Sequence, residues 1–275
     1  MNDQERALDA MVNADAEPLN VDASYAYQTC CISTHGPNRI LILNAPGVLR
    51  NMLVSAVKTS YRKGISKEVG QQEVILHGRP FFPFGQDLQD GVRITYALIR
   101  CMIQCGWDIT TDINLSWRTF DVATLYFHKS ESSDSKSRQH VVVCAIDLVD
   151  LNGIQVIDAP VALVNLVKTV IQQRWTAGHT YSLAQGTPEF RLKGFAFESA
   201  SSSQLAGSRM LLGTLLSRLR QDGYKLITTC NTKATEHGQL STLIIQCPTS
   251  ALEPSEQPDA KSQRPGTFAD YTDAD

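Results

Sequence analysis

Two stretches of the chain carry the same pattern of apolar and polar positions. Residues 73–81 read EVILHGRPF and residues 189–197 read EFRLKGFAF, so Glu, Leu, Gly and Phe recur at the same offsets. Apolar residues at alternate positions, followed by a glycine, are typical of a strand that ends in a turn. The pattern therefore predicts an equivalent strand in two halves of the chain.

The match continues on both sides of these strands. Residues 45–64 align with 159–178 without a gap, and both segments begin with Ala-Pro and end with Gly. Further along, Gly91 and Arg93 align with Gly207 and Arg209, and Gly-Trp at 106–107 aligns with Gly-Tyr at 223–224. A colinear series with matching periodicity indicates an internal duplication. Its period is the size of a small domain.

The same order of elements is predicted around each copy of the strand. An apolar hairpin precedes it, marked most clearly by Asn-Gly at 152–153. An amphipathic helix follows the hairpin. It is expected to be capped by Asn44 or Asp158 and to stop at Gly64 or Gly178. A second helix and two strands complete each unit. The predicted fold class is α+β, a tandem duplication of a β-β-α-β-α-β-β unit.

The second helix of each unit, about 88–105 and 204–221, is apolar over most of its circumference. A helix of this kind is expected to be covered on two sides. We expect the two units to pack as a pseudo-two-fold pair, with these helices as the candidate interface. The alternative is that each helix is buried by its own sheet.

Composition shifts divide the chain into five segments. We expect a disordered N-terminal tail at 1–22, repeat unit 1 at 23–128, a flexible Ser-rich linker at 129–139, repeat unit 2 at 140–247 and a disordered acidic C-terminal tail at 248–275. Within the last segment, residues 267–275 mix aromatic and acidic side chains. They are either a short docking peptide or a solubilising end.

Charge and composition narrow the classes of function. The 275 residues carry a net charge of −3, which argues against a nucleic-acid surface driven by bulk charge. The first residues lack the basic and apolar regions of a signal peptide, and no apolar run is long enough to span a membrane. Seven cysteines in such a chain indicate reduced thiols. We expect a cytoplasmic or nuclear protein with no nucleic-acid or membrane partner.

The loop after the first repeated strand is the strongest candidate site. Its residues Arg79, Pro80, Phe82, Pro83 and Phe84 combine exposed aromatics with rigid prolines, which suits a binding hot spot for a partner protein. The alternative is that Phe82 and Phe84 cover the following helix. The duplicated Phe81 is expected in the core.

Other groups favour structural roles. Glu73 with Arg93, and Glu189 with Arg209, are expected to form ion pairs that tie strand to helix. Cys101 and Cys105 share a helix face, but no other ligand motif accompanies them, so buried thiols are expected rather than zinc. No phosphate-binding loop is present. We therefore predict no catalytic residue, no metal and no cofactor.

The first hypothesis for function is a non-enzymatic protein–protein interaction or scaffold protein, and an enzyme is less favoured. The alternative is an enzyme or small-ligand binder with its site in the cleft between the units, where His77, Arg79 and Asp112 are the residues to inspect. A homo-oligomer assembled through edge strands is a third hypothesis.

Overall fold

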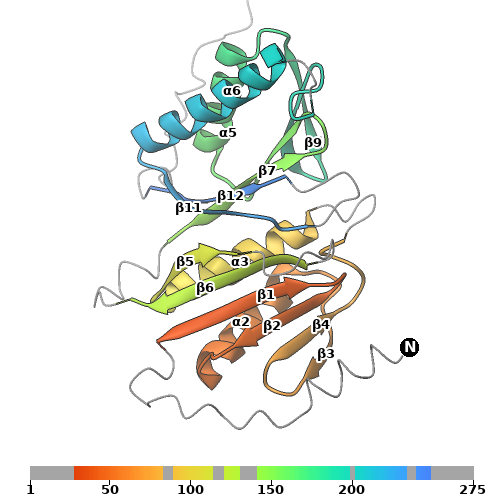
Figure 1. The fold of residues 1–275 in the computed structure, drawn as a ribbon, viewed down its shortest axis with the longest axis vertical. Coiled ribbons are helices and arrows are strands. Elements are labelled where there is room, and N and C mark those ends of the chain that lie inside the picture. Colours follow the sequence, from red (N-terminus) through yellow and green to blue (C-terminus); the bar gives the residue numbers. More distant parts are fainter. Residues whose placement is uncertain are drawn as a thin grey trace, which may run out of the picture.

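The computed structural model describes residues 28–82, 89–113, 121–130, 141–198, 202–233 and 240–248. Within these ranges it contains two units of one architecture, each a six-stranded antiparallel sheet with two helices (Figure 1). The predicted α+β class and the tandem duplication are confirmed. The linker was predicted at 129–139, but Lys129 ends the last strand of the first unit, and residues 131–139 lie outside the described residues. So do the N-terminal tail at 1–22 and the C-terminal tail from residue 249. No described helix is long and apolar enough to cross a membrane.

Both units follow the same chain path. The elements of the first unit are β1 (Thr29–His35), β2 (Arg39–Leu43), α2 (Gly47–Ser60), β3 (Ile65–Val69), β4 (Glu73–Leu76), α3 (Asp90–Gln104), β5 (Trp107–Asp112) and β6 (Asp121–Lys129). Those of the second are β7 (Val143–Val149), β8 (Gly153–Ile157), α5 (Val161–Arg174), β9 (His179–Ala184), β10 (Thr187–Leu192), α6 (Ser202–Gln221), β11 (Lys225–Cys230) and β12 (Thr242–Gln246). The sheet orders are β3-β4-β2-β1-β6-β5 and β9-β10-β8-β7-β12-β11. In each unit the last strand of the sequence pairs with the first, β6 with β1 and β12 with β7.

Each described unit has one strand more than the sequence predicted. The additional strands, β3 and β9, form hairpins with β4 and β10 and lie at the edges of their sheets. Most of their residues are exposed on both faces. A strand without a buried face has no alternation of apolar and polar residues, and its pattern does not distinguish it from a loop.

The first helix of each unit is anchored at its end by an aromatic residue. The hydroxyl of Tyr61 donates to the carbonyl of His77, and Trp175 Nε1 donates to the carbonyl of Lys193 at 3.1 Å. Gly64 and Gly178 adopt positive φ, but the helices end earlier, at Ser60 and Arg174.

The predicted helix caps are wrong. Neither α2 nor α5 has a side-chain cap, and Asn44 and Asp158 instead occupy left-handed turns, which these residue types tolerate. Asn44 Nδ2 donates to the carbonyl of Thr29 at 2.6 Å. Asp158 contacts the other unit.

The two sheets differ in how they are covered. In β1 and β2 buried residues alternate with exposed or half-buried ones, whereas every residue of β7 and β8 is buried. One face of the second sheet packs under α5 and α6. The opposite face contributes to the core of the first unit, through Val143, Ala145, Ile157, Cys230 and Ile244. The second sheet therefore lies between its own helices and the first unit.

Helix α3 forms the first unit's side of this contact, because it lies against β7. Ile94, Leu98 and Met102 make one fully buried stripe. A second buried stripe follows at helical spacing, through Val92, Thr95, Ile99 and Ile103. The prediction that this helix is covered on two sides is confirmed.

Helix α6 keeps only one of these stripes. When the C-terminal ends of α3 and α6 are aligned, Gln104 matches Gln221. The stripe Ile94, Leu98 and Met102 then corresponds to Leu211, Leu215 and Leu219 of α6, which are all buried. The second stripe becomes Arg209, Leu212, Leu216 and Arg220, which are exposed or half-buried. In this register arginines stand at the positions of Val92 and Ile103, although Arg209 aligns with Arg93 when the starts of the helices are matched. Helix α6 is covered on one side, so the predicted cover on two sides is wrong for this helix.

The expected pseudo-two-fold packing of the two units is therefore wrong. A helix of the first unit meets a sheet face of the second, and α5 and α6 lie on the far side of the second sheet (Figure 1). The edge strands β5 and β11 also lie side by side. Two different surfaces meet, so the arrangement is head to tail.

Candidate functional site

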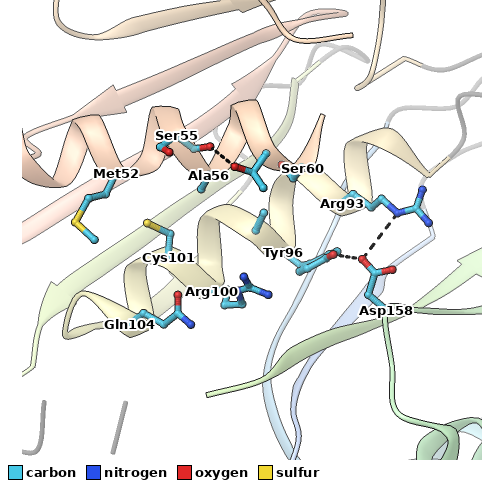
Figure 2. Close-up of a pocket in the computed structure, with 12 residues that line it drawn as sticks. Met52, Ser55, Ala56, Ser60, Arg93, Tyr96, Arg100, Cys101, Gln104 and Asp158 are labelled. Carbon is cyan, nitrogen blue, oxygen red and sulfur yellow. Dashed lines mark hydrogen bonds and ion pairs between the residues drawn. The ribbon is translucent and has the colours of Figure 1, made fainter. Parts of the chain in front are cut away.

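A groove between α2 and α3 ends at the boundary with the second unit (Figure 2). It encloses about 550 Å³. Its lining residues come from both helices and from the turn after β8. They are Met52, Ser55, Ala56, Thr59, Ser60, Arg93, Tyr96, Ala97, Arg100, Cys101, Gln104 and Asp158.

The end of the groove at the unit boundary is polar. Tyr96 donates its hydroxyl hydrogen to Asp158 Oδ2, and Arg93 Nε lies 3.9 Å from the same oxygen. Arg93 Nη2 also donates to Thr187 Oγ1 at 3.2 Å. Burial, together with the bond to Asp158, raises the pKa of Tyr96, so the phenol remains a donor. These contacts join α3 to the turn after β8 and to the first residue of β10.

The remaining charge in the groove is basic. Arg100 lies two helical turns beyond Arg93 on the same face of α3 and is exposed. Arg93, Arg100 and Asp158 are the charged residues of the lining. Because Asp158 offsets one guanidinium, the groove carries a net positive charge.

The floor of the groove is small and apolar. It includes Ala56, Ala97, the half-exposed Met52 and the buried Cys101. A hydrogen bond with Cys105, together with burial, raises the pKa of the Cys101 thiol. A protonated thiol is a poor nucleophile, so Cys101 is not activated, whereas the same hydrogen bond lowers the pKa of the half-buried Cys105. Among the described residues, no group of three or more His, Cys, Asp or Glu side chains is placed to hold a metal ion.

A second candidate surface is the outward face of the first sheet, which we call the open face. It consists of Cys31, Ser33, Leu41, Leu43, Glu73, Ile75, Thr124 and Tyr126. Register places Leu43, Cys31 and Tyr126 in one row across β2, β1 and β6. Leu41 lies in the next row, opposite Ser33. These side chains are mostly half-buried, and the exposed Arg39, opposite Ile75, pairs with Glu73 on the same face. The open face is therefore a row of apolar side chains with an ion pair beside it.

The equivalent face of the second sheet is covered, and most of its polar groups are paired, although Gln155 Oε1 is buried without a hydrogen-bond partner among the described residues. Asp147, opposite Gln155 and Thr242, receives hydrogen bonds from Lys233 Nζ and from Thr242 Oγ1, the latter at 2.7 Å. Asp147 and Lys233 are almost completely buried. Gln155 Nε2 donates to Glu189 Oε2 at 2.5 Å. A sheet face of this fold therefore accepts a helix when most of its polar groups are paired.

The described part of the Phe/Pro loop packs against the core. Phe81 is fully buried as expected, Pro80 is buried, and the half-buried Phe82 contacts the first core. The guanidinium of Arg79 lies 5.1 Å from the centre of the Phe82 ring. Pro83 and Phe84 lie outside the described residues. Partner binding by this loop stays a prediction.

The predicted strand-to-helix ion pairs are wrong. Glu73 pairs with Arg39 at 3.1 Å, across neighbouring strands. Glu189 pairs with Arg191 in its own strand, and Arg209 donates to the carbonyl of Leu205. Arg93 reaches the second unit instead, a contact that residue spacing within one unit does not reveal.

The three residues of the enzyme alternative do not come together. His77 and Arg79 follow β4 near one edge of the first sheet and are exposed, whereas Asp112 ends β5 at the opposite edge. Asp112 lies at the unit boundary, because the backbone of Asn231 hydrogen-bonds to its carboxylate. The sequence did not indicate the groove residues Asp158 and Arg93, whose partners lie in the other unit.

The charge on Asp112 opposes folding. Its Oδ1 is buried without a hydrogen-bond partner among the described residues. Burial raises its pKa to about 6, and the backbone hydrogen bonds from Thr124 and Asn231 only partly oppose this. Since the pKa is higher in the folded protein than in the unfolded chain, the folded state binds more protons. Stability therefore falls as pH rises from about 4 to about 6.

Asp112→Asn is expected to raise the free energy of unfolding at pH 7 by roughly 1 kcal/mol, discounted because the carboxyl is partly exposed. Asparagine removes the charge and can still accept the backbone hydrogen bonds. Urea unfolding at pH 4 and at pH 7 measures the effect. The variant should lose the fall in stability seen in wild type, and an unchanged fall would contradict the role given to Asp112.

Comparison with known proteins gives one result. A single protein domain family matches the chain twice, over residues 28–128 and 142–246. These two ranges are the two structural units. No curated protein sequence and no solved structure matches the chain.

Proposed function

Since the chain belongs to the family defined by this domain and carries it twice, we propose that it is a non-enzymatic interaction protein. Its open face binds an amphipathic helix of a partner protein. One observation carries the proposal: the equivalent face of the second sheet is covered by α3 of the first unit. The same face of the first sheet has no such cover among the described residues.

The contact between α3 and the second sheet suggests which side chains the partner helix presents to the open face. Of the two buried stripes of α3, we assign Val92, Thr95, Ile99 and Ile103 to the contact with the second sheet. This spacing places small and branched apolar side chains on one face of a helix. The open face offers matching apolar positions at Leu41, Leu43 and Tyr126. Its few charges argue for a protein rather than a nucleic acid.

The proposed compartment is the cytoplasm or nucleus. All seven cysteines are free. Cys144 and Cys247 lie with their sulfurs 3.5 Å apart as thiols rather than as a disulfide. An interaction protein that keeps such a pair reduced fits a reducing compartment.

Photo-crosslinking tests the proposal. Tyr126→p-benzoylphenylalanine in a cell extract should give an adduct with one partner, and the attachment site should lie in a helix with apolar residues at i, i+3 and i+7. Leu41→Asp should abolish the adduct, because a charge on the open face would be buried by the partner. Phe82→Ala in the same experiment tests the predicted Phe/Pro loop.

A probe in the second unit is the control. Tyr181 is exposed on β9, away from the open face. Tyr181→p-benzoylphenylalanine should not capture the same protein. Equal capture from both positions, or capture that survives Leu41→Asp, would contradict the proposal.

The alternative function is a small-ligand site in the α2–α3 groove. Its volume falls within the range of such sites, which favours this reading. Its convergent groups, however, are already bonded to one another, since Tyr96 and Arg93 both engage Asp158. A small ligand would have to replace these bonds, so the interaction function is better supported.

A further inference from the structure

We propose that residues 267–275 of this chain bind in the groove between α2 and α3. The proposal concerns a surface separate from the open face and does not depend on a partner protein. The proposed ligand of the groove is a peptide that carries aromatic and acidic side chains. Three observations carry it: the composition of the segment, the charge and shape of the groove, and the place where the described chain ends.

The segment combines two aromatic side chains with three acids. It reads TFADYTDAD, with Phe268 and Tyr271 three positions apart and acids at 270, 273 and 275. In a helical turn, residues three apart share one side. A peptide of this kind can direct both rings into a groove and keep its carboxylates at the rim, the mode in which an amphipathic segment binds between helices.

The groove offers the complementary groups. Ala56 and Ala97 leave room above the floor for an aromatic ring, and Met52 provides a half-exposed thioether that suits contact with one. Arg100 is exposed at the rim, and Arg93 lies two turns away. Because Asp158 offsets Arg93, the positive charge of Arg100 remains, and it matches an acidic segment better than a neutral or basic one.

The described chain ends close to the groove. Cys247, the residue before the last described one, has its sulfur 3.5 Å from that of Cys144. Cys144 lies beside Asp158, because Ala145 pairs with Ile157 between β7 and β8. Asp158 is itself part of the groove lining. Residues 249–266 could span about 60 Å if extended, so the segment is long enough to reach the groove.

Crosslinking within the full-length chain tests the proposal. Phe268→p-benzoylphenylalanine should give an adduct within one chain, attached to groove residues of α2 or α3 such as Met52. Arg100→Glu should lower the yield roughly two- to fivefold, the size expected for a solvent-exposed ion pair. The matched control is Arg220→Glu, at an exposed position of α6, and it should leave the yield unchanged.

Three outcomes would overturn the proposal. Adducts scattered over the surface would show that the segment has no preferred site. An unchanged yield in Arg100→Glu, with the fold intact by circular dichroism, would show that the groove does not hold it. An adduct between two chains would assign the segment to a second copy. None of these results depends on the open face, so the proposed function is tested separately.

Discussion

Gly91→Ala is expected to lower the free energy of unfolding by about 1–3 kcal/mol, the cost of inserting a methyl group where there is no space. A Cβ at this position would lie 2.5 Å from the carbonyl oxygen of Thr232 and 2.7 Å from that of Pro80. Both oxygens are backbone atoms, one in each unit, so no side chain can move aside. The start of α3 would have to withdraw from the second unit.

The equivalent helix supplies the control. Gly207, which aligns with Gly91 in the sequence, would place its Cβ 3.5 Å from Trp175 Cζ3, an ordinary contact. Gly207→Ala is expected to stabilise the protein by up to about 1 kcal/mol, because alanine is the better helix former. Urea unfolding measures both variants. If Gly91→Ala were neutral or stabilising, α3 could not begin between these two carbonyls.

Removing one member of the buried pair formed by Lys233 and Asp147 should cost more, about 3–5 kcal/mol, because it leaves an uncompensated buried charge. The side chains of Lys233 and Asp147 are 5% and 0% exposed. Asp147→Ala would also deprive Thr242 of its acceptor. Both Asp147→Ala and Lys233→Met should lower the unfolding midpoint sharply in a thermal or urea transition.

Two further variants distinguish the effect of burying the charges from the effect of pairing them. Asp222→Asn breaks an exposed pair with Arg218 on α6 and should cost less than about 0.5 kcal/mol. The double variant Asp147→Leu/Lys233→Met removes both charges and should recover much of the loss, because apolar replacements of a buried pair are often tolerated. A single variant no worse than Asp222→Asn would mean that the pair is not buried.

Repetition made much of the fold predictable. Two copies of one pattern gave the fold class and the buried Phe81, because core positions recur when a unit is duplicated. The edge strands β3 and β9 were missed because an exposed strand lacks a buried face. The packing of the units was mispredicted because it depends on where the copies differ. Arg220 replaces the apolar Ile103, and this difference indicates which of the two helices is covered on both sides.

The candidate sites were less predictable for the same reason. Asp158 looked like a helix cap, and its contacts with Tyr96 and Arg93 require a partner helix more than 60 residues away in sequence. The open face could not be distinguished from its covered counterpart, because Leu43 and Ile157 both read as strand residues. Only the asymmetric docking of the units makes one surface available and the other core.

Hydroxyl-radical footprinting compares these two faces directly. Leu43 and Ile157 occupy equivalent positions and have similar side chains, as partners of Cys31 and Ala145. We expect Leu43 and Tyr126 to be oxidised in the free protein and Ile157 and Ile244 to be protected. Equal oxidation of Leu43 and Ile157, or equal protection, would contradict the central claim that the units meet head to tail and leave one sheet face open.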